Sequence, residues 1–286
     1  MNMSSTKLTK FISPKISQCT LGRSATQLSS LPPIGYIYLG NVSYAKALDM
    51  QKQLCRRRID EIYAGPHHSR ISRETRILAD SLILLEHSPV YTNGRRNHGV
   101  LSVDEISRLR KLGCDYVETN RGGEITFHGP GQLVAYPNLY LKDHHLGTKC
   151  YVKGLEHTIV EACARLGIDA DVVDGFPGVW VSHTQKVAAL GTHVQKYVTS
   201  HGFALNCTTD MKWFNEIVPC GLEGRSATSL ANVLTKQGRS DVDADASVGA
   251  VLPTVIDSFK AVFGCDVLPL EEVSPETYTT IRQLLE

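Results

Sequence analysis

The sequence has no long apolar run: nothing in its 286 residues approaches the roughly 18 consecutive apolar positions that a membrane-spanning helix needs. It has no C-x-x-C and no H-E-x-x-H, so the common zinc spacings are missing. The signatures of phosphate-binding loops, G-x-x-x-x-G-K-[ST] and a G-x-G-x-x-G that opens a helix, are missing too. We therefore expect no metal and no cofactor, and neither a membrane nor a nucleic acid among the partners.

Acidic residues are absent from the first 48 positions, which carry a few Lys and Arg among many Ser and Thr. That composition is typical of organellar transit peptides. The alternative is a disordered tail without a targeting role. We expect residues 1–31 to be such a segment, a mitochondrial location, and a single catalytic domain over residues 32–286.

The eight cysteines are scattered, and a disulfide scaffold is not expected in a chain of this size. Most of them fit small buried hydrophobic positions. Cys220 differs, because it lies between Pro219 and Gly221 in the loop sequence VPCGLEGRSATS. Gly221 leaves room for a substrate carbonyl, and free N–H groups nearby could stabilise an oxyanion. Spacing alone makes Cys220 one candidate for a reactive thiol.

Strand-like and helix-like patterns alternate along the rest of the chain. Such an order predicts an α/β (α+β) fold with a mixed β-sheet flanked by helices. A capping box is predicted at Ser102 and Glu105, and the residues around Ser274 and Pro275 favour the start of a helix. The expected strands cover 34–40, 80–94, 124–128, 178–194 (two strands) and 201–208; the expected helices cover 43–63, 101–113, 151–168 and 247–264, with a loop at 64–76.

The stretch RGGEITFHGPGQLVAYP, residues 121–137, combines exposed main chain with a short alternating strand. If Glu124–His128 is a strand, Ile125 and Phe127 face one way and Thr126 and His128 the other. Glycines on both sides permit close approach of a ligand. We expect a narrow cleft for a slender, mostly apolar ligand; a glycine-rich hairpin with only a structural role is the alternative.

A catalytic cysteine usually needs a base, and Lys186 begins the apolar strand KVAALG. Burial disfavours the ammonium form of lysine, so a buried lysine can serve as a base. The eleven histidines are further candidates. The alternative for Lys186 is a lysine at a sheet edge that points into water.

Four motifs in this order, RGGEITFHGPGQLVAYP, GVWVSHTQKVAALGTHV, SHGFALNC and IVPCGLEG, closely resemble those of the octanoyltransferases of lipoate biosynthesis. The resemblance extends over residues 34–265. It implies a fold similar to the biotin and lipoate protein ligase catalytic domain. It also implies transfer of an octanoyl group from octanoyl-acyl carrier protein, through a cysteine thioester, to a lysine of a lipoyl domain, without ATP or metal. The implied acceptors are lipoyl domains of 2-oxoacid dehydrogenases or the glycine cleavage H protein.

The same resemblance implies the site residues. The catalytic pair falls on Cys220 and Lys186. The acyl-binding residues fall on Arg121, Gly122, Gly123, Glu124, Ile125, Thr126, Phe127, His128, Ala189, Leu190, Gly191, Gly202, Phe203 and Ala204.

Three other functions compete with this hypothesis. An ATP-dependent lipoate protein ligase would share the fold but does not need a catalytic cysteine. An inactive scaffold for lipoylated enzymes would not need both Cys220 and Lys186. A papain-like hydrolase lacks its local cysteine signature here. For docking of an acidic carrier protein, we expect basic clusters at 56–58, 95–96 and 108–111 to contribute; the alternative for each single cluster is a solvated helix face.

Overall fold

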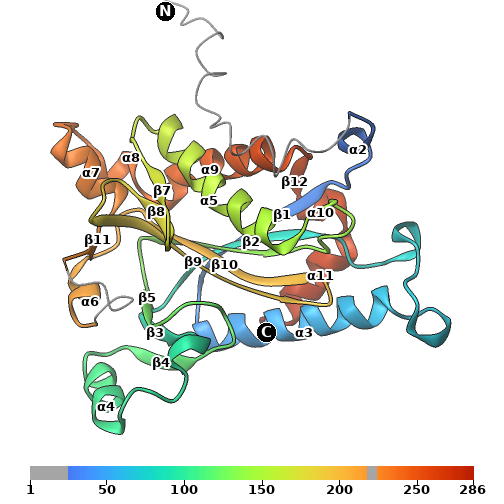
Figure 1. Cartoon of the computed structure of the whole chain (residues 1–286), viewed down its shortest axis with the longest axis horizontal. Helices are drawn as coiled ribbons and strands as arrows, with labels where there is room; N and C mark the ends of the chain where they lie inside the picture. Colours follow the sequence, from blue (N-terminus) through green and yellow to red (C-terminus); the bar gives the residue numbers. More distant parts are fainter. Residues whose placement is uncertain (1–24, 218–223) are drawn as a thin grey trace, which may run out of the picture.

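The computed structural model describes residues 25–217 and 224–286. Within these ranges a nine-stranded mixed sheet has the order β12-β1-β2-β6-β10-β9-β8-β7, with β11 paired to β9, and a small sheet has the order β4-β3-β5 (Figure 1). The strands are β1 (Ile34–Val42), β2 (Ser81–His87), β3 (Val90–Asn93), β4 (Asp115–Glu118), β5 (Thr126–His128), β6 (Gln132–Asn138), β7 (Asp171–Val173), β8 (Phe176–Trp180), β9 (Gln185–Gln195), β10 (Val198–Asn206), β11 (Ser226–Ala227) and β12 (Val267–Pro269).

The helices are α2 (Ala25–Ser29), α3 (Tyr44–Ile62), α4 (Val103–Lys111), α5 (Thr148–Arg165), α6 (Lys212–Asn215), α7 (Leu230–Lys236), α8 (Val242–Asp245), α9 (Val248–Phe263), α10 (Leu270–Val273) and α11 (Pro275–Gln283). Most helices lie against the large sheet, whereas α4 and α6 pack against the small sheet (Figure 1). Helices α5 and α9 lie on one face, whereas α3 and α11 lie on the other (Figure 1). This arrangement confirms the predicted mixed sheet flanked by helices.

Local sequence explains where the main helices begin. Ser43 caps α3 by accepting a hydrogen bond from the N–H of Lys46. At α4 the Ser102 side chain accepts from the N–H of Glu105, while Glu105 accepts from the N–H of Ser102, which confirms the predicted capping box. Helix α11 opens at Ser274 with Pro275 in its first turn, again as predicted.

The segment predicted as one strand over residues 80–94 is two strands in different sheets. Strand β2 pairs with β1 and β6, whereas β3 pairs with β4 and β5. Ser88 and Pro89 separate them, and proline cannot donate to a strand ladder. The break therefore directs the chain out of the large sheet and starts the small sheet.

The 64–76 loop carries two 3₁₀ turns, Pro66–His68 and Arg73–Thr75. Its C-terminal end is fixed to the fold, because the Arg76 guanidinium lies 2.6 Å from the Asp143 carboxylate.

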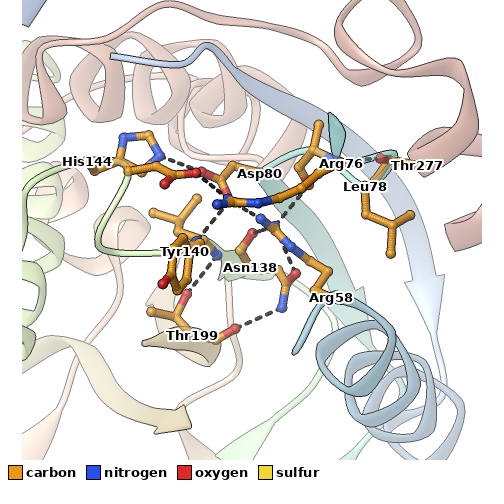
Figure 2. Close-up of polar contacts among 12 residues, drawn as sticks. Arg58, Arg76, Leu78, Asp80, Asn138, Tyr140, His144, Thr199 and Thr277 are labelled. Carbon is orange, nitrogen blue, oxygen red and sulfur yellow. Dashed lines mark hydrogen bonds and ion pairs between the residues drawn. The ribbon is translucent and has the colours of Figure 1, made fainter. Parts of the chain in front are cut away.

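A buried ionic network fixes the C-terminal half of α3 against the sheet (Figure 2). The Arg58 guanidinium contacts the Asp80 carboxylate and donates to the main-chain oxygen of Asn138. Asp80 also accepts from the N–H of Tyr140 at 2.9 Å and lies 2.6 Å from Nε2 of His144. Burial alone would raise the pKa of Asp80, but the Arg58 charge and the His144 hydrogen bond outweigh it and hold that pKa well below its ordinary value. The network shows that Arg58 is a buried structural residue rather than part of a basic docking surface.

Candidate active site

A cavity of about 210 Å³ lies on the α3 side of the large sheet and is closed by the small sheet. Alternate residues of three neighbouring strands form its base. Ala204 of β10 stands opposite Ala189 of β9 and Val134 of β6, and Gly202 stands opposite Gly191. Because side chains at alternate positions of paired strands share a face, these small residues form a channel along the strands.

Arg121 holds the glycine-rich wall of the cavity in place. Its Nη2 donates to the carbonyl oxygens of Thr92 (2.6 Å) and Glu124 (2.8 Å), and its Nη1 donates to that of Gly122 (2.9 Å). The side chain is buried, so a guanidinium with several carbonyl partners fixes the loop that precedes β5. Arg121 thus lines the cavity and also joins β3 to the loop that covers it.

Lys186 lies at one end of the channel. Its ammonium group stands over the Trp180 ring, with Nζ 4.7 Å from the ring centroid. The side chain is partly buried and lines the cavity, so the alternative of a lysine directed into water is wrong. Gly178 lies against the Lys186 stem, where an added Cβ would be 3.1 Å from Cδ. Nearby, the Arg225 guanidinium covers the Phe176 ring at 3.4 Å.

Cys220 belongs to the 218–223 segment, which lies outside the described residues, and described residues on both sides of that segment line the cavity. Phe214 and Arg225 line it on either side of the segment. Ala227 pairs with Lys186, and the N–H of Thr228 donates to the Lys186 carbonyl oxygen at 2.8 Å.

Most predicted site residues come together in this cavity. They are Lys186, Arg121, Gly123, Glu124, Ile125, Thr126, His128, Ala189, Leu190, Gly191, Gly202, Phe203 and Ala204.

Two predicted residues do not line the cavity. Phe127 is fully buried in a separate cluster, where its ring stacks on Trp213 with centroids 5.3 Å apart. Alternation along β5 directs Thr126 and His128 into the cavity and Phe127 to the opposite face. Ile125, predicted on the Phe127 face, precedes β5; it packs in the Phe127 cluster but also lines the cavity. Gly122 instead links the wall to β9, because its N–H donates to the Thr192 carbonyl oxygen.

The end of the cavity away from Lys186 contains polar rings that the sequence analysis missed. Tyr44, Tyr136 and His201 line it together with the predicted His128. Tyr44 stacks on His128 at 5.8 Å, and Tyr136 meets His201 edge to face at 6.2 Å. Burial, together with the Arg121 charge, lowers the pKa of His201 to about 3, so this ring is uncharged at neutral pH. The only sequence signal for His201 was its place beside the SHGFALNC glycine.

Comparison with known proteins agrees with this fold. Residues 43–259 match the family model of the lipoyl protein ligase A/B catalytic domain. The chain is 41% identical to the mitochondrial octanoyl-[acyl-carrier-protein]:protein N-octanoyltransferase of Danio rerio, over 80% of this chain and 92% of the relative. It is 43% identical to an octanoyltransferase of Solibacter usitatus, over 68% and 80% of the two chains. A putative lipoate protein ligase from T. acidophilum shares the fold, with a TM-score of 0.57, 14% identity, and coverage of 88% of this chain and 93% of that one.

Proposed function

The chain belongs to the lipoyl protein ligase A/B catalytic domain family and is an octanoyltransferase, and we propose that it works through a thioester on Cys220. The octanoyl group passes from octanoyl-acyl carrier protein to the ε-amine of a lysine in a lipoyl domain. One observation supports the proposal: Lys186 lines the cavity together with Phe214 and Arg225, which precede and follow the segment that contains Cys220.

The first half of the reaction forms the acyl-enzyme. A free thiol with a pKa near 8.5 is only a few per cent thiolate at pH 7, and a neighbouring ammonium group raises that fraction. The Cys220 thiolate attacks the thioester carbonyl, a new C–S bond forms, and the C–S bond to the carrier breaks. The carrier thiolate leaves and takes up a proton. The octanoyl chain lies along the small residues Ala189, Ala204 and Gly202.

The second half forms the amide. The acceptor lysine amine attacks the Cys220 thioester, the C–N bond forms, and the C–S bond to the enzyme breaks. Lys186, when it is neutral, takes the proton that the amine loses. One thioester is exchanged for another in the first half, and amide formation runs downhill in the second, so the proposed reaction needs no ATP.

Intact-mass spectrometry tests the proposal. Incubation with octanoyl-acyl carrier protein should add one octanoyl group to the wild-type chain and none to Cys220→Ala. Lys186→Ala should slow both half-reactions by at least 100-fold. Lys186→Arg should recover part of the first half only, because arginine keeps its charge but cannot accept a proton.

Mass spectrometry of the lipoyl domain also distinguishes the proposed transferase from an ATP-dependent lipoate protein ligase. Free octanoate with ATP should give no acylated lipoyl domain, while the carrier thioester should. Acylation from octanoate and ATP alone, or an octanoyl adduct on Cys220→Ala with continued transfer, would overturn the proposed chemistry.

We further propose a mitochondrial location and, as acceptors, lipoyl domains of 2-oxoacid dehydrogenases or the glycine cleavage H protein. The acid-free N-terminal 48 residues support the location, as do relatives whose names include that compartment. Bacterial octanoyltransferases are about equally similar, so the location rests mainly on the N-terminal composition.

A further inference from the structure

His201 separates the acyl cavity from a second cavity. It lines the 210 Å³ cavity together with Tyr136 and Gly202, and it lines a 630 Å³ cavity together with Gln51 and His193. His201 is itself 5% exposed. Its ring therefore lies in the partition between the two spaces.

The backbone at His201 is held in an uncommon conformation. Its φ is +53°, in the left-handed region that residues with a side chain seldom adopt. The N–H of His201 donates to Oε1 of the buried Gln51 at 2.8 Å, which fixes this conformation from α3. A strained residue that is held by a buried side chain is a feature found at functional positions.

The His201 ring also has a polar atom with nothing to bind. Its Nδ1 is buried and has no hydrogen-bond partner among the residues that the structure describes. Burying such an atom without a partner is unfavourable, so its retention is a further unusual feature of this position.

The distance between the cavity-lining residues of β10 matches the length of a short acyl chain. Asn206, Ala204 and Gly202 line the cavity in sequence, and at about 3.4 Å per residue the first and last are roughly 14 Å apart. An extended eight-carbon chain is about 9 Å long, given single bonds of roughly 1.5 Å. The rings of Tyr136 and His201 occupy the last part of this span. For a chain whose carbonyl carbon lies beside Asn206, eight carbons therefore fit, whereas twelve would reach the rings.

We propose that His201 is the residue that limits acyl-chain length, as the wall that ends the acyl cavity. The proposal rests on the octanoyl transfer described above and adds the specificity determinant. Replacing His201 by a small residue joins the two cavities, and chains longer than eight carbons then extend through the opening.

The test compares His201→Gly with the wild-type chain in a mixture of octanoyl-, decanoyl- and dodecanoyl-acyl carrier protein. Intact-mass spectra give the ratio of dodecanoyl to octanoyl adduct, which should rise at least tenfold. Glycine adopts positive φ without strain, and His201→Asn, which also tolerates that conformation, provides a second and smaller opening. His193→Ala is the matched control, because His193 lines only the second cavity, and its ratio should stay at the wild-type value.

A second measurement does not depend on the covalent chemistry. Trp180 lines the acyl cavity, so titration with free octanoic and dodecanoic acids can be followed by tryptophan fluorescence. In His201→Gly the ratio of the dodecanoic acid affinity to the octanoic acid affinity should be at least fivefold higher than in the wild type. An unchanged length preference in both variants, by either measurement, would overturn the role of His201. Loss of the wild-type octanoyl adduct itself would instead count against the proposed transfer.

Discussion

The position of the Lys186 ammonium group is set by the two strands next to β9, namely β11 and β8. Ala227 of β11 pairs with it, and Gly178 of β8 lies against its stem. Gly178 has a φ of +120°, and an added Cβ would meet the Ala188 carbonyl oxygen at 2.6 Å. The position of the catalytic candidate therefore depends on the absence of a side chain at residue 178.

Gly178→Ala should lower the free energy of unfolding by about 1–3 kcal/mol, because alanine is strained at this φ. It should also slow acyl-enzyme formation at least tenfold by displacing Lys186. Gly175→Ala is the matched control: its φ is +82° but an added Cβ meets nothing within 4 Å. Mass spectrometry of samples quenched at different times gives the rate of acyl-enzyme formation, and urea unfolding gives the stability, so the two effects can be measured separately. Equal rate losses in both variants would show that backbone strain, and not contact with Lys186, slows the reaction.

The buried histidines make stability depend on pH. Burial lowers the pKa of His87 to about 4, and burial with the Arg121 charge lowers that of His201 to about 3. In the unfolded chain both titrate near 6.5, so below that pH the unfolded state binds more protons and stability falls. Lowering the pH from 6.5 to 5 should therefore reduce the free energy of unfolding by about 1.5 kcal/mol for each of these two histidines.

Urea midpoints at these two pH values check the prediction. From pH 6.5 to pH 5 the free energy of unfolding of the wild-type chain should fall by the sum of these contributions. That of His201→Asn should fall by about 1.5 kcal/mol less. Parallel pH curves for the two proteins would mean that His201 is charged in the folded state, contrary to its environment.

At the scale of elements, α3 is attached to the sheet by apolar contacts and by one buried ion pair. Ala47, Met50 and Leu54 face the sheet, while Arg58 binds Asp80 near the start of β2 (Figure 2). The helix also carries Tyr44 and Gln51, which contact the polar end of the cavity. Displacement of α3 would therefore alter the acyl site as well as the core.

Asp80→Asn should destabilise the chain by about 3–5 kcal/mol at pH 7, because it leaves the Arg58 guanidinium buried without a countercharge. Since the pKa of Asp80 is lowered by folding, its contribution is present above its unfolded pKa near 3.9 and is lost as pH falls toward the folded value. The penalty of the substitution should thus be smaller at pH 3 than at pH 7. Combining it with Arg58→Met should cost less than the sum of the single changes. Additive losses in urea unfolding would refute direct coupling of the pair.

At the scale of the whole molecule, the basic clusters differ from the sequence-based expectation. Arg58 is buried in an ion pair, and Arg108 is bound to Glu216 at 2.7 Å. Arg110 and Lys111 remain exposed at the end of α4, on the same small-sheet unit that carries Arg96 to the cavity. This unit is the better candidate for docking an acidic carrier protein.

Arg110→Gln with Lys111→Gln should raise KM for octanoyl-acyl carrier protein about fivefold at low salt, as expected for two exposed charges worth roughly 1 kcal/mol together. The effect should fade at 0.5 M salt. Arg56→Gln with Arg57→Gln on α3 is the matched control and should leave KM unchanged. If both pairs raised KM equally, docking would depend on overall charge and not on the α4 surface.

Residues near the N-terminal boundary contact the folded body. The Ser30 carbonyl oxygen accepts from Arg73, and Leu31 packs against the core. Deleting residues 2–24 should therefore keep activity and stability while moving the protein to the cytosol of a eukaryotic cell, as cell fractionation would detect. Continued mitochondrial location of the shortened chain would contradict a targeting role; the predicted boundary at residue 31 stays a prediction.

The sequence by itself determined the features that depend on near neighbours. The α4 capping box, the apolar face of α3 and the alternation in β5 follow from hydrogen bonds and side-chain directions within a few residues. The linear motifs likewise identified Lys186 and most of the cavity lining. Tertiary structure alone decided the rest: the division of residues 80–94 between two sheets, the burial of Arg58 and the partition formed by His201. Each of these depends on contacts between segments far apart in the chain, such as the hydrogen bond between His201 and Gln51. Such contacts form only when the chain folds, so local sequence patterns do not predict them.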